Sequence, residues 1–267
     1  MGQVHFTKMN GCGNDFIVVD ARKEKLPRDL AGWSRQVCDR RFGIGADGVL
    51  VLGPVKKADF SLRTFNADGS EAEMCGNGAR CAALYAHRNG VGEQMSFTTP
   101  AGVIRAEASA ATAAIYLTDP KDYRPEIKLE ALGQKLTAHF IDSGVPHAVI
   151  FVDDVTTADV DHLGRAIRQH DEFAPRGTNV DFVQVIDSAT LKMRTYERGV
   201  EGETHACGTG SVASCVVAAR LGKALPPVNV QVPGGVLTVD FEDDGKAVRN
   251  VRLSGDTQVV FEGVVQA

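Results

Sequence analysis

The chain has 267 residues, 43% of them hydrophobic, and a formal net charge of -5 at pH 7. This length allows one or two domains with large cores, and the negative charge gives no reason to expect nucleic acid or an anionic membrane as a partner. Because no stretch approaches the roughly 18 apolar residues of a membrane span and the start lacks the apolar run of a signal peptide, we expect a cytoplasmic protein with reduced cysteines.

The two halves of the chain show the same order of predicted elements. Short apolar runs predict strands, and spaced apolar residues predict helices. The first half contains strand Phe16–Val19, helix Asp29–Arg40, strands Gly48–Leu52 and Phe60–Phe65, and helix Ala79–Tyr85. The second half contains strand His147–Val152, helix Ala158–His170, strands Val180–Ile186 and Leu191–Tyr196, and helix Val212–Leu221. Gly90 and Gly222 follow the last helix of each half as C-terminal stop signals.

A duplicated cysteine motif supports this division. Cys75-Gly76-Asn77-Gly78 and Cys207-Gly208-Thr209-Gly210 begin 132 residues apart. Two copies are too few for a solenoid, so we predict two related domains. The N-terminal domain covers residues 1–121 and carries Cys75, and the C-terminal domain covers residues 122–267 and carries Cys207, with the last strand free to pack back on the N-terminal domain.

The helices that follow the two motifs are small or apolar on nearly all sides, which indicates that both are buried. We therefore predict an α+β fold made of two pseudo-symmetric domains. Each domain is expected to be a curled, barrel-like β-sheet around a central helix. The active site is expected in the cleft between the two domains.

A glycine-rich turn that enters a helix offers free backbone N–H groups at the positive end of the helix dipole. That end binds anions such as a carboxylate, and it lowers the pKa of a cysteine placed there. Two such motifs facing each other would hold the α-carboxylate of an amino acid with its α-carbon between Cys75 and Cys207. One sulfur could then remove the α-proton while the other returns a proton to the opposite face, and no cofactor or metal ion is needed in principle.

Other readings of the cysteines and glycines stay open. Four cysteines are interpreted as small buried hydrophobic residues, namely Cys12, Cys38, Cys81 and Cys215. Zinc binding is a weaker alternative, because neither motif cysteine has the close partner of a structural zinc site. A thiol–disulfide redox protein is the alternative from another functional class, although redox cysteines usually lie close in sequence. The run Gly43–Gly48 matches a dinucleotide fingerprint, but a strand follows it instead of a helix, so we predict a turn.

Several motifs in one order resemble the diaminopimelate epimerase family, whose members invert one centre of LL-diaminopimelate without a cofactor. The motifs lie at Lys8–Phe16, Phe65–Ser70, Met74–Arg80, Glu197–Gly199 and Glu203–Gly210, and the resemblance covers essentially the whole chain. It implies an isomerase that interconverts LL- and meso-diaminopimelate in lysine and peptidoglycan precursor biosynthesis. It also implies a small-molecule amino-acid substrate and a homodimer.

The resemblance further implies roles for individual residues. Cys75 and Cys207 would be the base and acid pair, with His147 and Glu197 as polar partners that tune them. The residues that would bind the two ends of the substrate are Asn14, Asn66, Gly76, Asn77, Gly78, Asn179, Arg198, Gly208 and Thr209. A guanidinium such as that of Arg198 suits a distal carboxylate. Ordinary turn asparagines, a surface arginine and a structural His147 are the alternatives.

Two positions depart from the family pattern. The family often has Asn where this chain has Val145, and often Gln where it has Gly48. Both changes remove a polar group from the expected pocket. A racemase of another amino acid, such as a proline-like one, therefore stays an alternative to a diaminopimelate epimerase.

Overall fold

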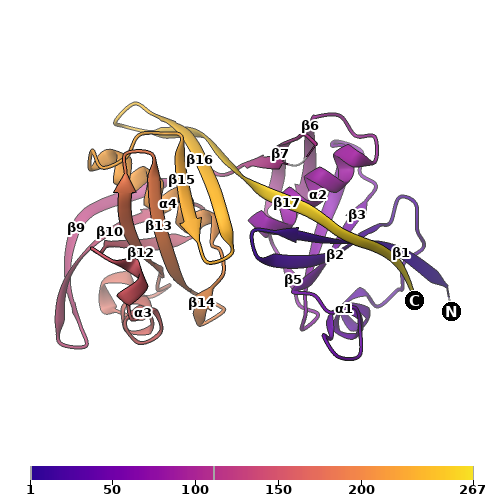
Figure 1. The fold of residues 1–267 in the computed structure, drawn as a ribbon, viewed down its shortest axis with the longest axis horizontal. Helices are drawn as coiled ribbons and strands as arrows, with labels where there is room; N and C mark the ends of the chain where they lie inside the picture. Colours follow the sequence, from indigo (N-terminus) through magenta and orange to yellow (C-terminus); the bar gives the residue numbers. More distant parts are fainter. Residues whose placement is uncertain (1, 111, 267) are drawn as a thin grey trace. The chain divides into compact units, whose positions relative to one another are not determined.

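The computed structural model describes residues 2–110 and 112–266, and the chain divides into two compact units (Figure 1). The first unit runs to Ile115 and takes up the chain again from Ser254, whereas the second comprises Tyr116–Leu253. Each unit combines β-strands with two α-helices in its described residues, so the fold is α+β, as the sequence predicts. The domain boundary after residue 121 stays a prediction.

The first unit contains the following strands and helices, besides part of the last strand of the chain. They are β1 (Gln3–Gly11), β2 (Asn14–Asp20), α1 (Leu30–Cys38), β3 (Gly48–Gly53), β4 (Phe60–Asn66), β5 (Glu71–Ala72), α2 (Gly76–Arg88), β6 (Gln94–Thr99), β7 (Gly102–Ala108) and β8 (Thr112–Tyr116). No helix in the described residues is long and apolar enough to cross a membrane.

The second unit repeats this order after a long hairpin. Its elements are β9 (Lys121–Ala131), β10 (Gln134–Asp142), β11 (Pro146–Phe151), η1 (Val155–Thr157), α3 (Val160–Arg168), η2 (Asp171–Phe173), β12 (Asn179–Asp187), β13 (Thr190–Glu197), β14 (Gly202–Thr204), α4 (Gly208–Arg220), β15 (Val228–Val232) and β16 (Gly235–Asp243). The final strand, β17 (Val248–Gln266), contributes residues to both units and pairs antiparallel with β1 in the first.

The central strands of the first unit, β2 and β3, are buried on both faces. Ile17 and Val49 share a core cluster with Trp33 of α1, whereas Leu50 lies against Gly78 of α2. Because neighbouring side chains of a strand point to opposite faces, α1 and α2 cover opposite faces of the sheet. The parallel pair β2–β3 therefore reads as a nearly unbroken buried run.

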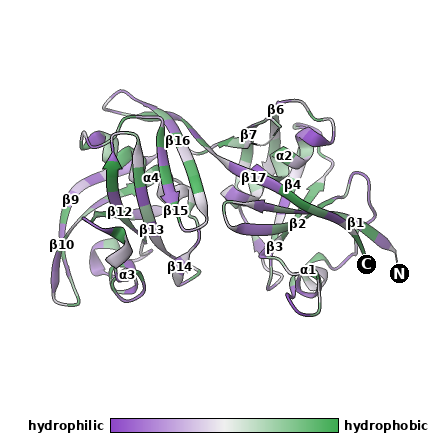
Figure 2. Ribbon diagram, in the orientation of Figure 1, coloured by the Kyte–Doolittle hydropathy of each residue, from purple (hydrophilic) through white to green (hydrophobic). Residues whose placement is uncertain are grey.

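The second unit is built in the same way. Ala148 and Phe182 share a core with Leu163 of α3, whereas Asp181 lies against Gly210 of α4. The helix α4 packs against strands β10, β11, β12, β13, β15 and β16, so that its residues from 210 to 218 are all buried. Figure 2 shows hydrophobic and hydrophilic residues together along α3, as expected for a helix with only one buried face.

Strand pairing shows how closely the halves correspond. The parallel pair β2–β3 places Phe16 opposite Gly48, and the parallel pair β11–β12 places His147 opposite Asn179. Adding 131 to each residue number of the first pair gives the second pair. The antiparallel pairs Leu50–Thr64 and Asp181–Thr195 obey the same rule. This common register confirms the pseudo-symmetric fold that the repeated motif predicts.

Tight packing between α3 and β13 can be tested at Gly164. A Cβ atom at Gly164 would lie 2.6 Å from Cβ of the buried Tyr196. We expect Gly164→Ala to lower the free energy of unfolding by about 1 kcal/mol or more, because overpacking outweighs the gain in helix propensity. Urea denaturation followed by circular dichroism measures this change. The control is Gly202→Ala, since no heavy atom lies within 4 Å of its added Cβ. Equal stability of the two variants would contradict the close contact.

Candidate active site

Cys75 occupies the N-cap position of α2. Its backbone is extended, with φ -133° and ψ 115°, and its sulfur accepts a hydrogen bond from the backbone N–H of Gly78 at 3.4 Å. The side chain of Leu50 closes the space beside Gly78, where a Cβ would lie 2.9 Å from Leu50 Cδ2. The thiol therefore sits at the positive end of the helix dipole, which favours an anion, and Gly78 lets Leu50 approach this first turn.

Cys207 occupies the same position of α4. Its sulfur accepts from the backbone N–H of Gly210, again at 3.4 Å. It is only 6% exposed, whereas Cys75 is partly exposed. Both cysteines are free thiols. The two units thus present the same N-cap geometry at their motif helices.

A chain of hydrogen bonds orders the polar side chains near Cys75. Arg80 Nη2 donates to Asn77 Oδ1 at 2.8 Å, Asn77 Nδ2 donates to Asn14 Oδ1 at 2.6 Å, and Asn14 Nδ2 donates to Asp47 Oδ2 at 2.9 Å. Arginine can only donate, and an aspartate carboxylate can only accept. Arg80 at one end of this series of hydrogen bonds and Asp47 at the other therefore fix the orientation of the amides of Asn77 and Asn14. Burial lowers the pKa of Arg80, which is fully enclosed.

Asn66 belongs to the same edge of the first unit. It ends β4 and lies opposite Gly48, which begins β3 beside the start of β2. Its amide donates to Ser70 Oγ at 2.9 Å. A Cβ atom at Gly48 would lie 2.6 Å from the carbonyl oxygen of Phe65, so the backbone leaves no room for a side chain at this position.

His147 and its neighbours form the corresponding edge of the second unit. The imidazole is fully buried, and its Nδ1 lies 2.7 Å from Asp181 Oδ2. Its Nε2 lies 3.0 Å from Thr209 Oγ1, which in turn lies 3.5 Å from the sulfur of Cys207. A continuous line of polar atoms thus joins Asp181 to Cys207.

Asn179 links the histidine to the predicted substrate-binding arginine. Its Nδ2 donates to the Pro146 carbonyl at 3.1 Å and lies 3.3 Å from His147 Nε2, while its Oδ1 accepts from the backbone N–H of Arg198 at 2.7 Å. The guanidinium of Arg198 donates to the carbonyl of Arg176 at 3.1 Å. The backbone of Arg198 is therefore held by Asn179, while its side chain reaches toward the surface.

Burial dominates the acidity of the groups around Cys207. It raises the pKa of the Cys207 thiol well above its usual range, and the nearby carboxylates of Glu197 and Asp181 add to this effect. Hydrogen bonds from Thr209 and Gly210 act in the opposite direction. Burial also raises the pKa of Glu197, while a hydrogen bond with Thr204 and the neighbouring His147 act in the opposite direction.

Each unit gathers its predicted residues at one sheet edge and one helix N-terminus. Asn14, Cys75, Gly76, Asn77 and Gly78 meet in the first unit. His147, Asn179, Arg198, Cys207 and Thr209 are linked by the contacts of the second, with Gly208 as the first residue of α4. Glu197 is next to Arg198 and close enough to influence the acidity of Cys207.

The structure adds residues that sequence reasoning missed. Asp181 contacts His147, Arg80 and Asp47 hold the amides of the first unit, and Ser143 Oγ donates to the Thr209 carbonyl at 2.8 Å. One signal was present in the sequence, because Asp181 is a charged residue that interrupts the apolar run of residues 180–183. Arg80 closes the motif Met74–Arg80, whereas Asp47 and Ser143 carry no comparable sequence signal.

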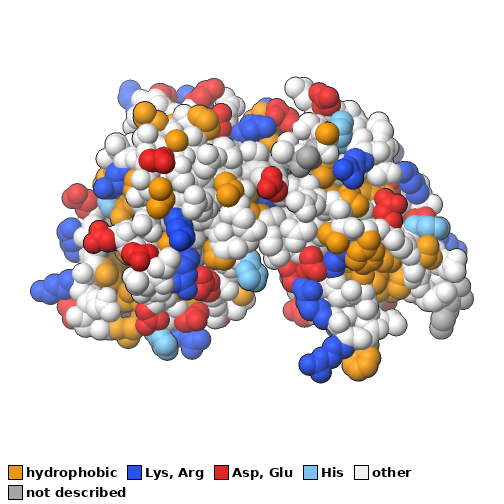
Figure 3. Space-filling model, viewed as in Figure 1, with side chains coloured by type: hydrophobic (Ala, Val, Ile, Leu, Met, Phe, Trp, Pro, Cys, Tyr) orange, Lys and Arg blue, Asp and Glu red, His pale blue; other side chains and the backbone are white. Residues whose placement is uncertain are grey.

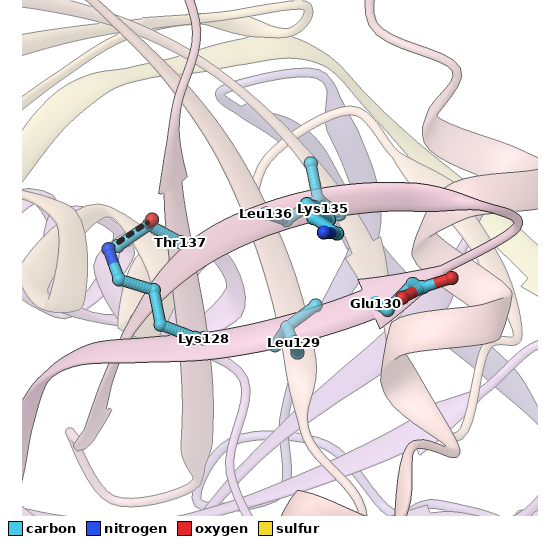
Figure 4. Close-up of a pocket in the computed structure, with 6 residues that line it drawn as sticks. All are labelled: Lys128, Leu129, Glu130, Lys135, Leu136 and Thr137. Atoms are coloured by element: carbon cyan, nitrogen blue, oxygen red, sulfur yellow. Dashed lines mark hydrogen bonds between the residues drawn. The ribbon is translucent and has the colours of Figure 1, made fainter.

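The candidate site is not the hollow on the β9–β10 hairpin. That hollow has a volume of about 390 Å³ and is lined by Lys128, Leu129, Glu130, Lys135, Leu136 and Thr137 (Figure 4). Lys128 Nζ donates to Thr137 Oγ1 across it at 2.9 Å, and none of the predicted residues line it. In the part of the chain that the structure describes, no three His, Cys, Asp or Glu side chains are placed to hold a metal ion.

Comparisons with known proteins agree with one another. The family model for diaminopimelate epimerase matches residues 6–123 and 139–259. A diaminopimelate epimerase of Aquifex aeolicus is 46% identical over 97% of each chain, and one of Methanothrix thermoacetophila is 43% identical over 99% of this chain and 97% of its own. A crystal structure of a PhzF-family phenazine biosynthesis protein of Bacillus anthracis has a TM-score of 0.75 over both full chains at 14% identity, so it shows a shared fold.

The start of β2 gives a prediction of pH dependence. Burial alone would raise the pKa of Asp15, but hydrogen bonds from Arg40 and Lys8 outweigh it and lower the pKa to about 2. The unfolded value is about 3.9, so ionised Asp15 stabilises the fold by about 2 kcal/mol above pH 4, and this is lost as the pH falls through 2. Asp15→Asn should therefore be less stable at pH 6 but equal to the parent near pH 2.

Urea denaturation at several pH values measures this difference. The matched control is Asp119→Asn, which changes an exposed carboxylate of the second unit. The control should leave the pH dependence of unfolding unchanged. A constant difference between Asp15→Asn and the parent from pH 6 to pH 2 would contradict the assignment.

Proposed function

Because the chain belongs to the diaminopimelate epimerase family, a family of isomerases, we propose that it interconverts LL- and meso-diaminopimelate. The observation that carries the proposal is the pair of thiols at equivalent N-cap positions, Cys75 on α2 and Cys207 on α4. In this proposal one sulfur removes the α-proton as a thiolate while the other delivers a proton as a thiol. The reaction needs no cofactor.

The helix N-termini are the proposed carboxylate sites. The first backbone N–H groups of α2 and α4, at Gly76, Asn77, Gly208 and Thr209, have no partner within their helix. They are suited to the carboxylate next to the reacting carbon, where negative charge develops as the α-proton leaves. Donors that are already oriented toward such charge are usually the largest contribution to catalysis of this kind.

The remaining predicted residues divide between the two ends of the substrate. Asn14 and Glu197 are proposed to contact the reacting amine. Asn66, Asn179 and Arg198 are proposed to hold the distal amino-acid centre, where the guanidinium of Arg198 would pair with the second carboxylate. His147 and Glu197 are proposed to tune the cysteines, which is supported by their positions around Cys207.

A racemase of another amino acid is the second candidate. The observation that favours it is the absence of a polar side chain at Val145 and Gly48, where a distal amide would otherwise be expected. Assays of LL-diaminopimelate beside a panel of monoamino acids and proline decide between the two. Turnover of the diamino substrate alone supports the first proposal, and turnover of a monoamino acid alone supports the second.

We also propose a cytoplasmic homodimer. Val260, Phe261 and Val264 on β17 are 57%, 47% and 49% exposed, although all three are large and hydrophobic. Figure 3 shows hydrophobic side chains gathered over the C-terminal part of β17 and the neighbouring β1. An apolar patch of this kind is typical of a surface that another chain covers. A second copy of this chain is the proposed occupant.

The two-thiol reaction makes a direct prediction about single cysteine variants. In heavy water the parent should place deuterium at the α-carbon of the product, as measured by mass spectrometry. Cys75→Ser and Cys207→Ser should each reduce turnover at least about 100-fold, because loss of a positioned proton-transfer group usually costs that much. Cys215→Ser, which changes a buried thiol away from both N-caps, is the control. Near-normal turnover of either motif variant would overturn the mechanism.

The proposed dimer surface can be tested at Val264. A charge at this exposed position would be costly to bury against a second copy. We expect the parent to have the mass of a dimer in light scattering after size exclusion, and Val264→Asp to have the mass of a monomer. Val236→Asp, which changes an exposed valine of the second unit, should stay dimeric. A parent protein that is monomeric at all concentrations would refute the proposal.

A further inference from the structure

The two halves differ in what lies behind their thiols. Leu50 and Asp181 occupy equivalent register positions, and each lies against the third residue of the motif helix, Gly78 or Gly210. Phe16 and His147 are also equivalent in register. The Cys75 half thus has two apolar residues where the Cys207 half has a carboxylate and an imidazole. Because the two units share the same strand register, comparing them identifies Asp181 and His147 as the residues specific to the Cys207 half.

Asp181 is held firmly in place. It is fully buried, and its Oδ1 accepts from Thr195 Oγ1 at 2.8 Å while its Oδ2 lies 2.7 Å from His147 Nδ1. A Cβ atom at Gly210 would lie 2.5 Å from Asp181 Oδ1, so the glycine allows the carboxylate to approach the first turn of α4. The positive end of the α4 dipole favours negative charge at this position.

The carboxylate determines which nitrogen of His147 carries the proton. An ionised carboxylate only accepts hydrogen bonds, so Nδ1 must donate to Asp181. In the neutral ring Nε2 is then an acceptor, and it faces the hydroxyl of Thr209 at 3.0 Å. The amide of Asn179 also donates toward Nε2 at 3.3 Å, which fits an acceptor at that nitrogen.

We propose that Asp181 is a positioning residue that keeps His147 ready to accept the Cys207 proton through the hydroxyl of Thr209. Nothing in the motif pattern assigns a role to Asp181. The inference deepens the proposed function, because it concerns how one thiol of the same site becomes a thiolate.

The proposed step is balanced. The S–H proton of Cys207 passes to Thr209 Oγ1 as the hydroxyl proton of Thr209 passes to His147 Nε2. Cys207 becomes a thiolate, Thr209 is unchanged, and His147 becomes an imidazolium whose Nδ1–H still donates to Asp181. Both heavy-atom distances along this path, 3.5 Å and 3.0 Å, are within hydrogen-bond range for sulfur and oxygen.

Electrostatics around the imidazole favour keeping the proton inside the cluster. The titratable groups that face it are Asp181 from β12, Glu197 from β13 and Cys207 at the start of α4. Burial and the two carboxylates raise the pKa of Cys207, so release of its proton to water is costly. Transfer to His147 instead forms the negative thiolate together with a positive imidazolium, so the net charge of the buried cluster does not change.

Thiol labelling tests this directly and needs no substrate. The parent and Asp181→Asn are treated with iodoacetamide across a pH series, and labelled Cys207 and Cys75 are quantified as separate peptides. Removing a charge beside the imidazole should slow labelling of Cys207 about tenfold at neutral pH. Labelling of Cys75 in the same molecules should be unchanged. The low exposure of Cys207 slows its labelling equally in both proteins, so the ratio of the two labelling rates reports the change in its ionisation.

Further variants at Thr209 and Thr195 keep the test decisive if Asp181→Asn fails to fold. Thr209→Val removes the bridging hydroxyl and should slow Cys207 labelling similarly, whereas Thr209→Ser keeps the hydroxyl and the labelling. Thr195→Val removes a donor to Asp181 and should slow Cys207 labelling to a lesser extent. Thr64→Val, at the equivalent register position of the first unit, is the matched control and should have no effect.

Nitrogen NMR of His147 reports which ring nitrogen is protonated, and this would not change if Asp181 only stabilised the fold. The parent should show a protonated Nδ1 and an unprotonated Nε2, and Asp181→Asn should shift the population toward protonated Nε2. Folded Asp181→Asn and Thr209→Val proteins with parental Cys207 labelling would overturn the inference, as would a protonated Nε2 in the neutral parent ring. Failure of epimerase activity in the parent with the labelling pattern intact would instead overturn the proposed function.

Discussion

The hydrogen bond from the third backbone N–H of a helix to the sulfur of its N-cap cysteine is the interaction on which both halves depend. It fixes the thiol at the positive helix end and leaves the preceding N–H groups open to an anion. Glycine is required at that third position, because Leu50 or Asp181 fills the space a side chain would take at Gly78 or Gly210. In each unit one glycine, Gly78 or Gly210, therefore both lets the sheet pack against the helix and donates the hydrogen bond to the cysteine sulfur.

Much of the fold could be predicted from the chain alone. The apolar run Phe16–Val19 lies within β2, and His147–Val152 extends one residue past the end of β11. The helix predicted at Asp29–Arg40 is observed as α1, with Asp29 as its N-cap and Cys38 as its last residue. The motif helices begin earlier than predicted, at Gly76 and Gly208. Glycine has low helix propensity, so the pattern hides a first turn that tertiary packing stabilises. The turn predicted at Gly43–Gly48 is observed as an irregular bend that ends one residue earlier, because Gly48 already begins β3.

The candidate site was predictable only where a motif marks it. Repeated cysteines and glycines identify Cys75 and Cys207, and their N-cap geometry follows from glycine-rich helix starts. Asp181 and Arg80 required the structure, because their partners lie on other elements and depend on strand register and helix rotation. Their burial gives them a large effect, since a charge removed from water acts strongly on its few neighbours. Substrate roles and the relation of the thiols to one carbon stay predictions.

The long strand β17 has a consequence for biosynthesis of the chain. Its residues from Ser254 onward complete the first unit by pairing along the edge of β1, although they are translated after the whole of the second unit. Tyr116–Leu253 is continuous and holds its own core, so it can fold as soon as it leaves the ribosome. The N-terminal strand must wait with an open hydrogen-bonding edge until then, a state that invites pairing with other nascent chains. Vectorial synthesis therefore favours maturation of the Cys207 half first.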